Sequence, residues 1–224
     1  MKHILTINNI DRVTHNVLRF KLSKPEGLSF VSGQAADIAI NKPGFEDQVR
    51  AFTFTCLPED DFLEFTIKIY PQHNGVTNKL STLKEGDELL LLGVFGDISY
   101  HGEGVFIAGG AGVTPFISIF KALEKSGNLG ESVLLFGNKK AEDIIDREYF
   151  SGLLKDRFIN VLSDEKSTDF KSGFIDQQVL QEVIDSAKDL KYFYLCGPDG
   201  MMKAVEESLK AIGIEKEFII RENF

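Results

Sequence analysis

The period of the hydrophobic residues changes partway along the chain, and this change constrains the fold more than any other feature. Before about residue 100, short runs rich in Val, Ile, Phe and Thr are separated by turn clusters such as KPEG, NKPG and KEGD. After Gly104, continuous apolar runs of strand length alternate with amphipathic helical segments. The first pattern is typical of an antiparallel sheet and the second of a parallel sheet covered by helices. We therefore expect two domains, residues 1–101 and 102–224.

The first domain is predicted to be a six-stranded antiparallel β-barrel. In the segment 62–69, apolar and largely polar residues alternate, as expected for a strand with one buried face. A short helical segment, Gly75–Leu83, interrupts the strands. The predicted strands are His3–Ile7, Val13–Lys21, Ala36–Ile40, Val49–Thr55, Phe62–Ile69 and Glu88–Leu92.

The second domain is predicted to be a doubly wound α/β domain with a five-stranded parallel sheet, because its strands are apolar throughout and alternate with helices. An amphipathic helix with apolar residues from Phe116 to Leu123 follows the first strand and stops near Gly127. Later helices are expected near residues 141–154, 176–187 and 199–211. The predicted strands are Val105–Ala108, Ser132–Phe136, Phe158–Leu162, Tyr192–Cys196 and Glu217–Ile220.

Composition excludes several classes of protein. With 25 basic and 34 acidic residues the net charge is −9, which disfavours binding to nucleic acid or to an anionic membrane surface. The two cysteines are far apart, so a disulfide framework, a four-cysteine zinc site and an iron–sulfur cluster all lack their thiolates. The four histidines show no metal-ligand spacing, so we expect no metal. Without an apolar run of membrane-spanning length or a signal peptide, the expected location is the cytoplasm.

A glycine-rich turn, Gly109–Pro115, follows the first parallel strand and precedes a helix. At this place in a doubly wound sheet, glycines let the backbone approach a phosphate and the helix N-terminus binds it. Thr114 is expected to cap the helix and Pro115 to occupy its first turn. The pattern is GxGxxP and not the dinucleotide fingerprint GxGxxG, so a ligand-free connection remains the alternative.

Two other short segments carry candidate chemistry. Cys196 ends a parallel strand and is followed by Gly197 and Pro198, which places a thiol at the ligand-binding edge of the sheet, although inert packing is the alternative. In the barrel, Arg50 and Phe52 share one face of a strand, so a charge for phosphate lies beside a ring for stacking. A plain strand-edge arginine over a core phenylalanine is the other interpretation.

The order of the motifs resembles that of the ferredoxin–NADP reductase-like flavoprotein superfamily, of the flavodoxin or ferredoxin reductase type without an iron–sulfur domain. The matching segments, in chain order, are RAFT, GVTNKL, GVFG, GGAGVTP, FGNKK, CGPDGM and a terminal ENF. They extend over essentially the whole chain. The resemblance implies a FAD-binding barrel followed by an NAD(P)-binding domain.

This resemblance implies a role for each matched residue on the FAD side. Arg50 would pair with the diphosphate, Thr53 would contact the isoalloxazine edge, and Phe52 stands where the family usually has Tyr. Phe224 would cover the flavin ring. The implied FAD-binding residues are Arg50, Ala51, Phe52, Thr53, Ile67, Lys68, Gly75, Val76, Thr77 and Phe224.

The resemblance also implies a nicotinamide nucleotide site and a group of residues that align the hydride transfer. Thr53, Cys196 and Glu222 would be the catalytic residues, aligning the hydride transfer without acid–base chemistry. Two lysines, Lys139 and Lys140, favour NADPH at the adenosine end, with NADH as the alternative. The implied NAD(P)-binding residues are Gly110, Gly112, Thr114, Pro115, Asn138, Lys139, Cys196, Gly197, Pro198 and Met201.

The expected function is that of a FAD-dependent NAD(P)H oxidoreductase that passes electrons to a separate soluble carrier such as ferredoxin or flavodoxin. A NAD(P)H:flavin reductase, or the reductase component of an oxygenase, is the alternative enzyme. An alternative from another class is a non-catalytic nucleotide-binding module for sensing or assembly.

Overall fold

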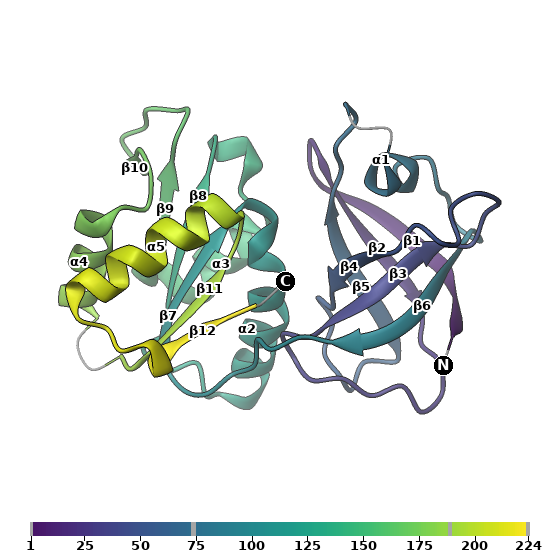
Figure 1. Ribbon diagram of the computed structural model, residues 1–224, viewed down its shortest axis with the longest axis horizontal. Helices are drawn as coiled ribbons and strands as arrows, with labels where there is room; N and C mark the ends of the chain where they lie inside the picture. Colours follow the sequence, from purple (N-terminus) through teal and green to yellow (C-terminus); the bar gives the residue numbers. More distant parts are fainter. Residues whose placement is uncertain (1, 73–74, 188–189, 223–224) are drawn as a thin grey trace. The chain divides into compact units, whose positions relative to one another are not determined.

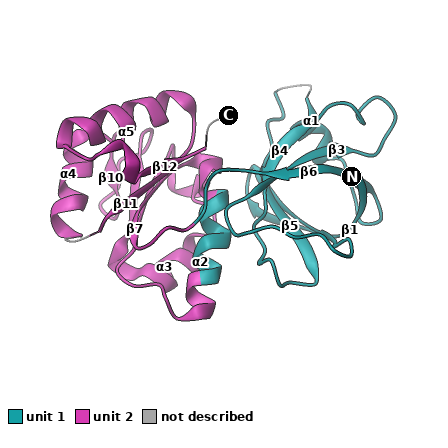
Figure 2. Ribbon diagram, turned by 60° about the horizontal axis from the view of Figure 1, so that its bottom comes forward, with its two compact units in different colours: residues 1–99, 114–122 teal, residues 100–113, 123–224 magenta. Residues whose placement is uncertain are grey.

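The computed structural model describes residues 2–72, 75–187 and 190–222 (Figure 1). The chain divides into two compact units (Figure 2). Unit 1 comprises residues 1–99 and 114–122, and unit 2 comprises residues 100–113 and 123–224. One helix, α2 (Thr114–Ser126), contributes its first part to unit 1 and its last turn to unit 2.

Unit 1 contains a six-stranded antiparallel sheet in the order β4-β3-β6-β1-β2-β5, as predicted. Phe54 forms an isolated antiparallel bridge with Phe65, which joins the chain just after β4 to β5, the strand at the other end of this order. This bridge closes the sheet into a barrel. The elements are β1 (His3–Thr14), β2 (Val17–Ser23), β3 (Ala35–Ile40), β4 (Arg50–Thr53), β5 (Phe62–Lys68), α1 (Val76–Leu80) and β6 (Glu88–Phe95).

The barrel core consists of the inward side chains of these strands. Phe54 lies between two other rings, with centroid distances of 4.0 Å to Phe30 and 5.0 Å to Phe65. Val76 and Leu80 of α1 are buried in the same core, which explains the helical spacing seen in that segment.

The predicted strand Val13–Lys21 is wrong, because the chain turns inside it. β1 continues to Thr14, and β2 begins at Val17 and pairs with it. Thr14 Oγ1 donates to Asn16 Oδ1 at 3.1 Å and accepts from Asn16 N at 3.4 Å, so side chains stabilise the turn. The turn carries no Gly or Pro, and the sequence pattern therefore hides it.

Unit 2 contains a parallel sheet in the order β10-β9-β8-β7-β11-β12. Helices α4 and α5 pack on one face, where Leu180 and Val205 join the strand residues Val105 and Ile107 in one core. α3 contributes Phe150 to the packing around Phe158. The predicted doubly wound class is confirmed. The strands are β7 (Gly104–Gly109), β8 (Val133–Asn138), β9 (Phe158–Leu162), β10 (Lys171–Ser172), β11 (Tyr192–Cys196) and β12 (Ile219–Arg221), and the helices are α3 (Arg147–Leu154), α4 (Gln177–Ser186) and α5 (Asp199–Ile212).

The predicted count of five strands is wrong, because the described part of the chain forms a sheet of six. The additional strand, β10, is two residues long and pairs with the end of β9, and two residues carry no readable period. The last strand also differs, because Lys216–Phe218 form a 3₁₀ turn and β12 begins at Ile219. As a result, Glu222 directly follows the strand.

The segment that opens unit 2 is fixed to the sheet by one tyrosine of β11. Tyr194 is fully buried, and its hydroxyl accepts from the amides of His101 (2.8 Å) and Gly102 (3.1 Å) and donates to the Gly102 carbonyl (2.8 Å). Its ring stacks on Phe106 with centroids 4.2 Å apart. Burial raises the pKa of this phenol to about 12, so it stays a donor across the physiological range.

We expect Tyr194→Phe to lower the free energy of unfolding by about 2 kcal/mol, because two backbone donors lose their acceptor. Tyr192→Phe is the matched control: no hydrogen bond to the Tyr192 hydroxyl is found among the described residues, and we expect a change below about 0.5 kcal/mol. Urea unfolding of both variants measures the difference. Equal losses in the two variants would contradict the role of the hydroxyl.

Candidate functional site

Strand β4, which lies at one end of the strand order of unit 1, contains the motif of Arg50 and Phe52. Arg50 and Ala51 are exposed, and Phe52 and Thr53 are half-buried. The Arg50 guanidinium donates to the Val49 carbonyl at 2.7 Å, and no carboxylate among the described residues pairs with it. Phe52 packs partly against the barrel core. A charged donor therefore lies beside a partly exposed ring, and this arrangement fits a ligand with a phosphate and a planar group.

The other FAD-assigned residues divide into two groups. Ile67 and Val76 are 2% and 1% exposed, so their side chains are core residues and only their backbone can face a ligand. Gly75 is the N-cap of α1, Thr77 lies in its first turn, and α1 packs against β3, the partner strand of β4. Lys68 is half-buried at the end of β5. Phe224 lies outside the described residues.

In unit 2, the two turns that the sequence marks separately lie side by side, because β7 and β11 are neighbouring parallel strands. A Cβ on Gly112 would lie 2.6 Å from the amide nitrogen of Gly197 and would overlap the Cys196 carbonyl. A Cβ on Gly109 would lie 2.9 Å from Pro198 Cδ. Both glycines are required for this close approach of two backbones. Gly109 is missing from the predicted set, although it belongs to the same motif.

The start of α2 differs from the expectation. Gly110–Val113 form a 3₁₀ turn that leads directly into the helix, and Val113 is the N-cap with a helical backbone. The prediction that Thr114 caps the helix is therefore wrong; Thr114 is its first residue and is buried. Pro115 occupies the first turn, where its missing N–H costs no hydrogen bond.

Cys196 and Glu222 are brought together by the register of β11 and β12. Leu195 pairs with Arg221, so the next residue on each strand stands at the same edge of the sheet. Burial, together with a smaller effect of the negative charge of Glu222, raises the pKa of the Cys196 thiol to about 12. The thiol is therefore neutral at pH 7, which suits a positioning role and not that of a nucleophile.

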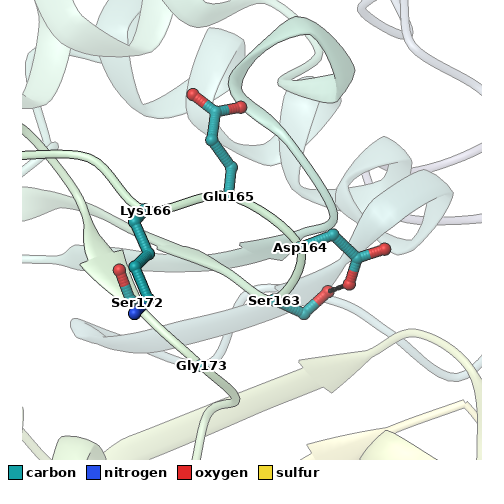
Figure 3. A pocket seen from close by; sticks show the side chains of 6 residues that line it. All are labelled: Ser163, Asp164, Glu165, Lys166, Ser172 and Gly173. Atoms are coloured by element: carbon teal, nitrogen blue, oxygen red, sulfur yellow. Dashed lines mark hydrogen bonds between the residues drawn. The ribbon is translucent and has the colours of Figure 1, made fainter.

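The loops after β8 and β9 also lie side by side. Ser163 N donates to Asn138 O at 3.0 Å, and Asp164 N donates to Lys139 O at 2.9 Å. Beside them is a cavity of about 460 Å³ (Figure 3). It is lined by Ser163, Asp164, Glu165, Lys166, Ser172 and Gly173. The sequence pattern does not indicate this cavity, because the cavity depends on the short strand β10.

The polar groups around this cavity fit an uncharged polar group of a ligand better than a phosphate group. Asp164 and Glu165 bring two carboxylates against the single ammonium of Lys166. Lys140 lies 3.8 Å from the Glu142 carboxylate, which offsets its charge. The Asn138 side-chain nitrogen is buried without a hydrogen-bond partner among the described residues, so a donor is left over at the end of β8.

Within the described ranges, no group of three or more His, Cys, Asp or Glu side chains is placed to hold a metal ion. Over the same residues, no helix has both the length and the apolar character needed to span a bilayer.

Family models match both halves of the chain. Residues 5–100 match the model described as an oxidoreductase FAD-binding domain, and residues 106–207 match an oxidoreductase NAD-binding domain. Among curated relatives, NADH-cytochrome b5 reductase 1 of Aspergillus terreus is 31% identical over 91% of this chain and 75% of its own length. The reductase component of propane 2-monooxygenase from Rhodococcus jostii is 28% identical, covering 97% of this chain and 62% of that protein.

Solved structures agree on the fold. A ferredoxin NADP⁺ reductase from Neisseria gonorrhoeae with bound FAD and NADP superposes with a TM-score of 0.84 at 21% identity, covering 99% and 98% of the two chains. The CS-b5R domains of human Ncb5or in its NAD⁺ form give a TM-score of 0.87 at 25% identity, covering 100% of this chain and 70% of that one.

The chain belongs to the ferredoxin–NADP reductase-type family of flavoprotein reductases. It is an oxidoreductase whose cofactors are FAD and a nicotinamide nucleotide, and the predicted family and cofactors are confirmed.

We expect Gly112→Ala to weaken nicotinamide nucleotide binding about tenfold, because the new methyl group forces the two turns apart. Gly152→Ala in α3 is the control, since a Cβ there meets nothing within 4 Å. Calorimetric titration with the nucleotide measures both dissociation constants. An unchanged constant in Gly112→Ala would show that the turn tolerates the displacement.

Proposed function

We propose that this enzyme passes electrons from a nicotinamide nucleotide through bound FAD to a separate electron-carrier protein, ferredoxin or flavodoxin in type, or to an oxygenase component. The observation that carries the proposal is the close packing of the Gly112 turn on the Cys196 turn at the edge of the sheet. In the same chain, Arg50 stands exposed on β4. The relatives include reductase components of oxygenase systems, which supports a protein acceptor.

In this proposal each residue binds or positions. Arg50 pairs with the diphosphate of FAD, and Phe52 and Thr53 face the flavin ring system. Thr114 and the neutral thiol of Cys196 align the nicotinamide. Bound FAD supplies the redox chemistry by accepting a hydride and releasing electrons to the acceptor.

Anaerobic titration tests this function. The purified protein should retain yellow FAD through gel filtration, and NADH or NADPH should bleach it. Loss of flavin on the column with activity restored by free flavin would indicate a flavin reductase instead. A protein that stays colourless after incubation with excess FAD, or whose bound FAD neither nucleotide bleaches, would contradict the proposal.

Cys196→Ala should slow this bleaching by about one to three orders of magnitude, because small misplacements are costly in a preorganised site. Cys196→Ser keeps a small donor at the same place and should lose less. Stopped-flow reduction at saturating nucleotide measures both rates. A Cys196→Ala rate within twofold of the parent would show that Cys196 does not align the nicotinamide.

We further propose that NADH is preferred over NADPH, against the expectation from Lys139 and Lys140. In a doubly wound sheet, the adenosine ribose of the nucleotide is held at the loops that correspond to those after β8 and β9. An acidic residue there accepts a hydrogen bond from the ribose 2′-hydroxyl and repels a 2′-phosphate. Asp164 has this position, with its carboxylate held by Ser163 Oγ at 2.6 Å.

The ratio of kcat/KM for NADH to that for NADPH should exceed one in the parent and fall about tenfold or more in Asp164→Asn. Asp169→Asn is the control, because it removes the same charge from an exposed residue outside the cavity lining. A parent enzyme that prefers NADPH would reverse the assignment and favour the two lysines.

A further inference from the structure

A cluster of polar residues, three buried and two half-buried, joins helix α2 to the barrel within unit 1. Its centre is Glu64 of β5, which is 9% exposed and accepts hydrogen bonds from Thr55 Oγ1 (2.9 Å) and Lys121 Nζ (3.0 Å). Arg19 Nε lies 3.7 Å from the same carboxylate and donates to Thr66 Oγ1 at 3.1 Å. We call these five residues the Glu64 cluster.

Helix α2 makes two further hydrogen bonds to the same part of the barrel. Lys121 Nζ donates to the Thr55 carbonyl at 2.7 Å, and the buried Ser118 Oγ donates to the Cys56 carbonyl at 2.9 Å. Ser118 and Lys121 are three residues apart and so share one face of the helix. Two side chains of α2 therefore hold the chain segment that directly follows β4.

The two elements held together carry predicted ligand-binding residues. β4 ends at Thr53, two residues before Thr55. α2 begins at Thr114, one turn before Ser118, and an α-helix is stiff over this length. The hydrogen bonds of Ser118 and Lys121 therefore act with the packing of buried apolar residues such as Phe120 to orient the start of α2 relative to β4.

Stability alone does not explain a charged cluster at this place. Removing a carboxylate such as that of Glu64 from water costs several kcal/mol, and the half-buried ammonium of Lys121 adds a smaller cost. Apolar side chains of similar volume often serve the fold equally well. A set of directional bonds instead defines one geometry, because each donor has one acceptor position.

We propose that Lys121 is a positioning residue for hydride transfer: together with Ser118 and Glu64 it sets the place of Thr114 relative to the flavin-binding strand β4. This inference rests on the proposed function. Lys121 itself touches neither predicted ligand site, so its loss should lower the rate at saturating nucleotide while nucleotide affinity changes little.

The test compares Lys121→Met with Lys24→Met in the FAD-loaded enzyme. Lys24 is a fitting control because its ammonium also donates to barrel carbonyls, those of Pro58 and Asp60, without contacting α2. Anaerobic stopped-flow over a range of nucleotide concentrations gives the limiting reduction rate and the dissociation constant. We expect Lys121→Met to lower the limiting rate about tenfold with less than a twofold change in the constant, and Lys24→Met to leave both unchanged.

Amide hydrogen exchange supplies a readout independent of turnover. In Lys121→Met, protection in the first turns of α2 should fall relative to the parent, and in Lys24→Met it should not. Lys121→Arg keeps the donor and should restore most of the rate. Should Lys121→Met fail to fold, Ser118→Ala removes one of the bonds alone and should slow reduction about threefold.

The outcomes separate this inference from the proposed function. A parent enzyme that neither nucleotide reduces overturns the function and the positioning role with it. If the parent is reduced and the rate of Lys121→Met or Ser118→Ala lies within about 1.5-fold of the parent rate, the positioning role alone is overturned. This margin is roughly the error of a stopped-flow rate, whereas the expected effects are about tenfold and threefold. Equal rate losses in Lys121→Met and Lys24→Met overturn it as well, because they would reflect general destabilisation.

Discussion

The close approach of two backbone turns at one edge of the parallel sheet is the constraint on which the proposed nucleotide site depends. β7 and β11 are hydrogen-bonded neighbours, and their carboxyl ends therefore lead into turns at the same place. Gly112 has no room for a Cβ against Cys196 and Gly197. Any larger residue at this position would push the two turns apart.

Polar side chains in this protein fix connecting segments, while phenylalanines and aliphatic residues form the cores. Tyr194 holds the segment that opens unit 2, and Glu64 with Lys121 holds the segment that follows β4. Tyr194 and Lys121 each bind backbone groups outside a regular strand, and Glu64 accepts from the Thr55 hydroxyl and from Lys121. Such groups must find partners when buried, and a side chain that supplies them also determines where the segment lies.

The places of Gly112, Pro115 and Cys196 in the fold were predictable, because each combines a residue type with a position in a strand–turn–helix unit. Their binding roles stay predictions. The roles of Ile67 and Val76 were less readable, since an apolar residue in a motif and one in a core look alike. The cavity at Asp164 depends on a strand of two residues. Lys121 gave no signal, because a lone lysine in an amphipathic helix resembles a solvated one.

The sequence by itself determined the two hydrophobic periods, hence the two fold classes, and the order of motifs that defines the family. The tertiary structure decided the sixth strand, the pairing that puts Glu222 beside Cys196, and the contact of Lys121 with Glu64, 57 residues away along the chain. The physical reason is that a period records which face of an element is buried. It carries no record of which distant residue packs on that face.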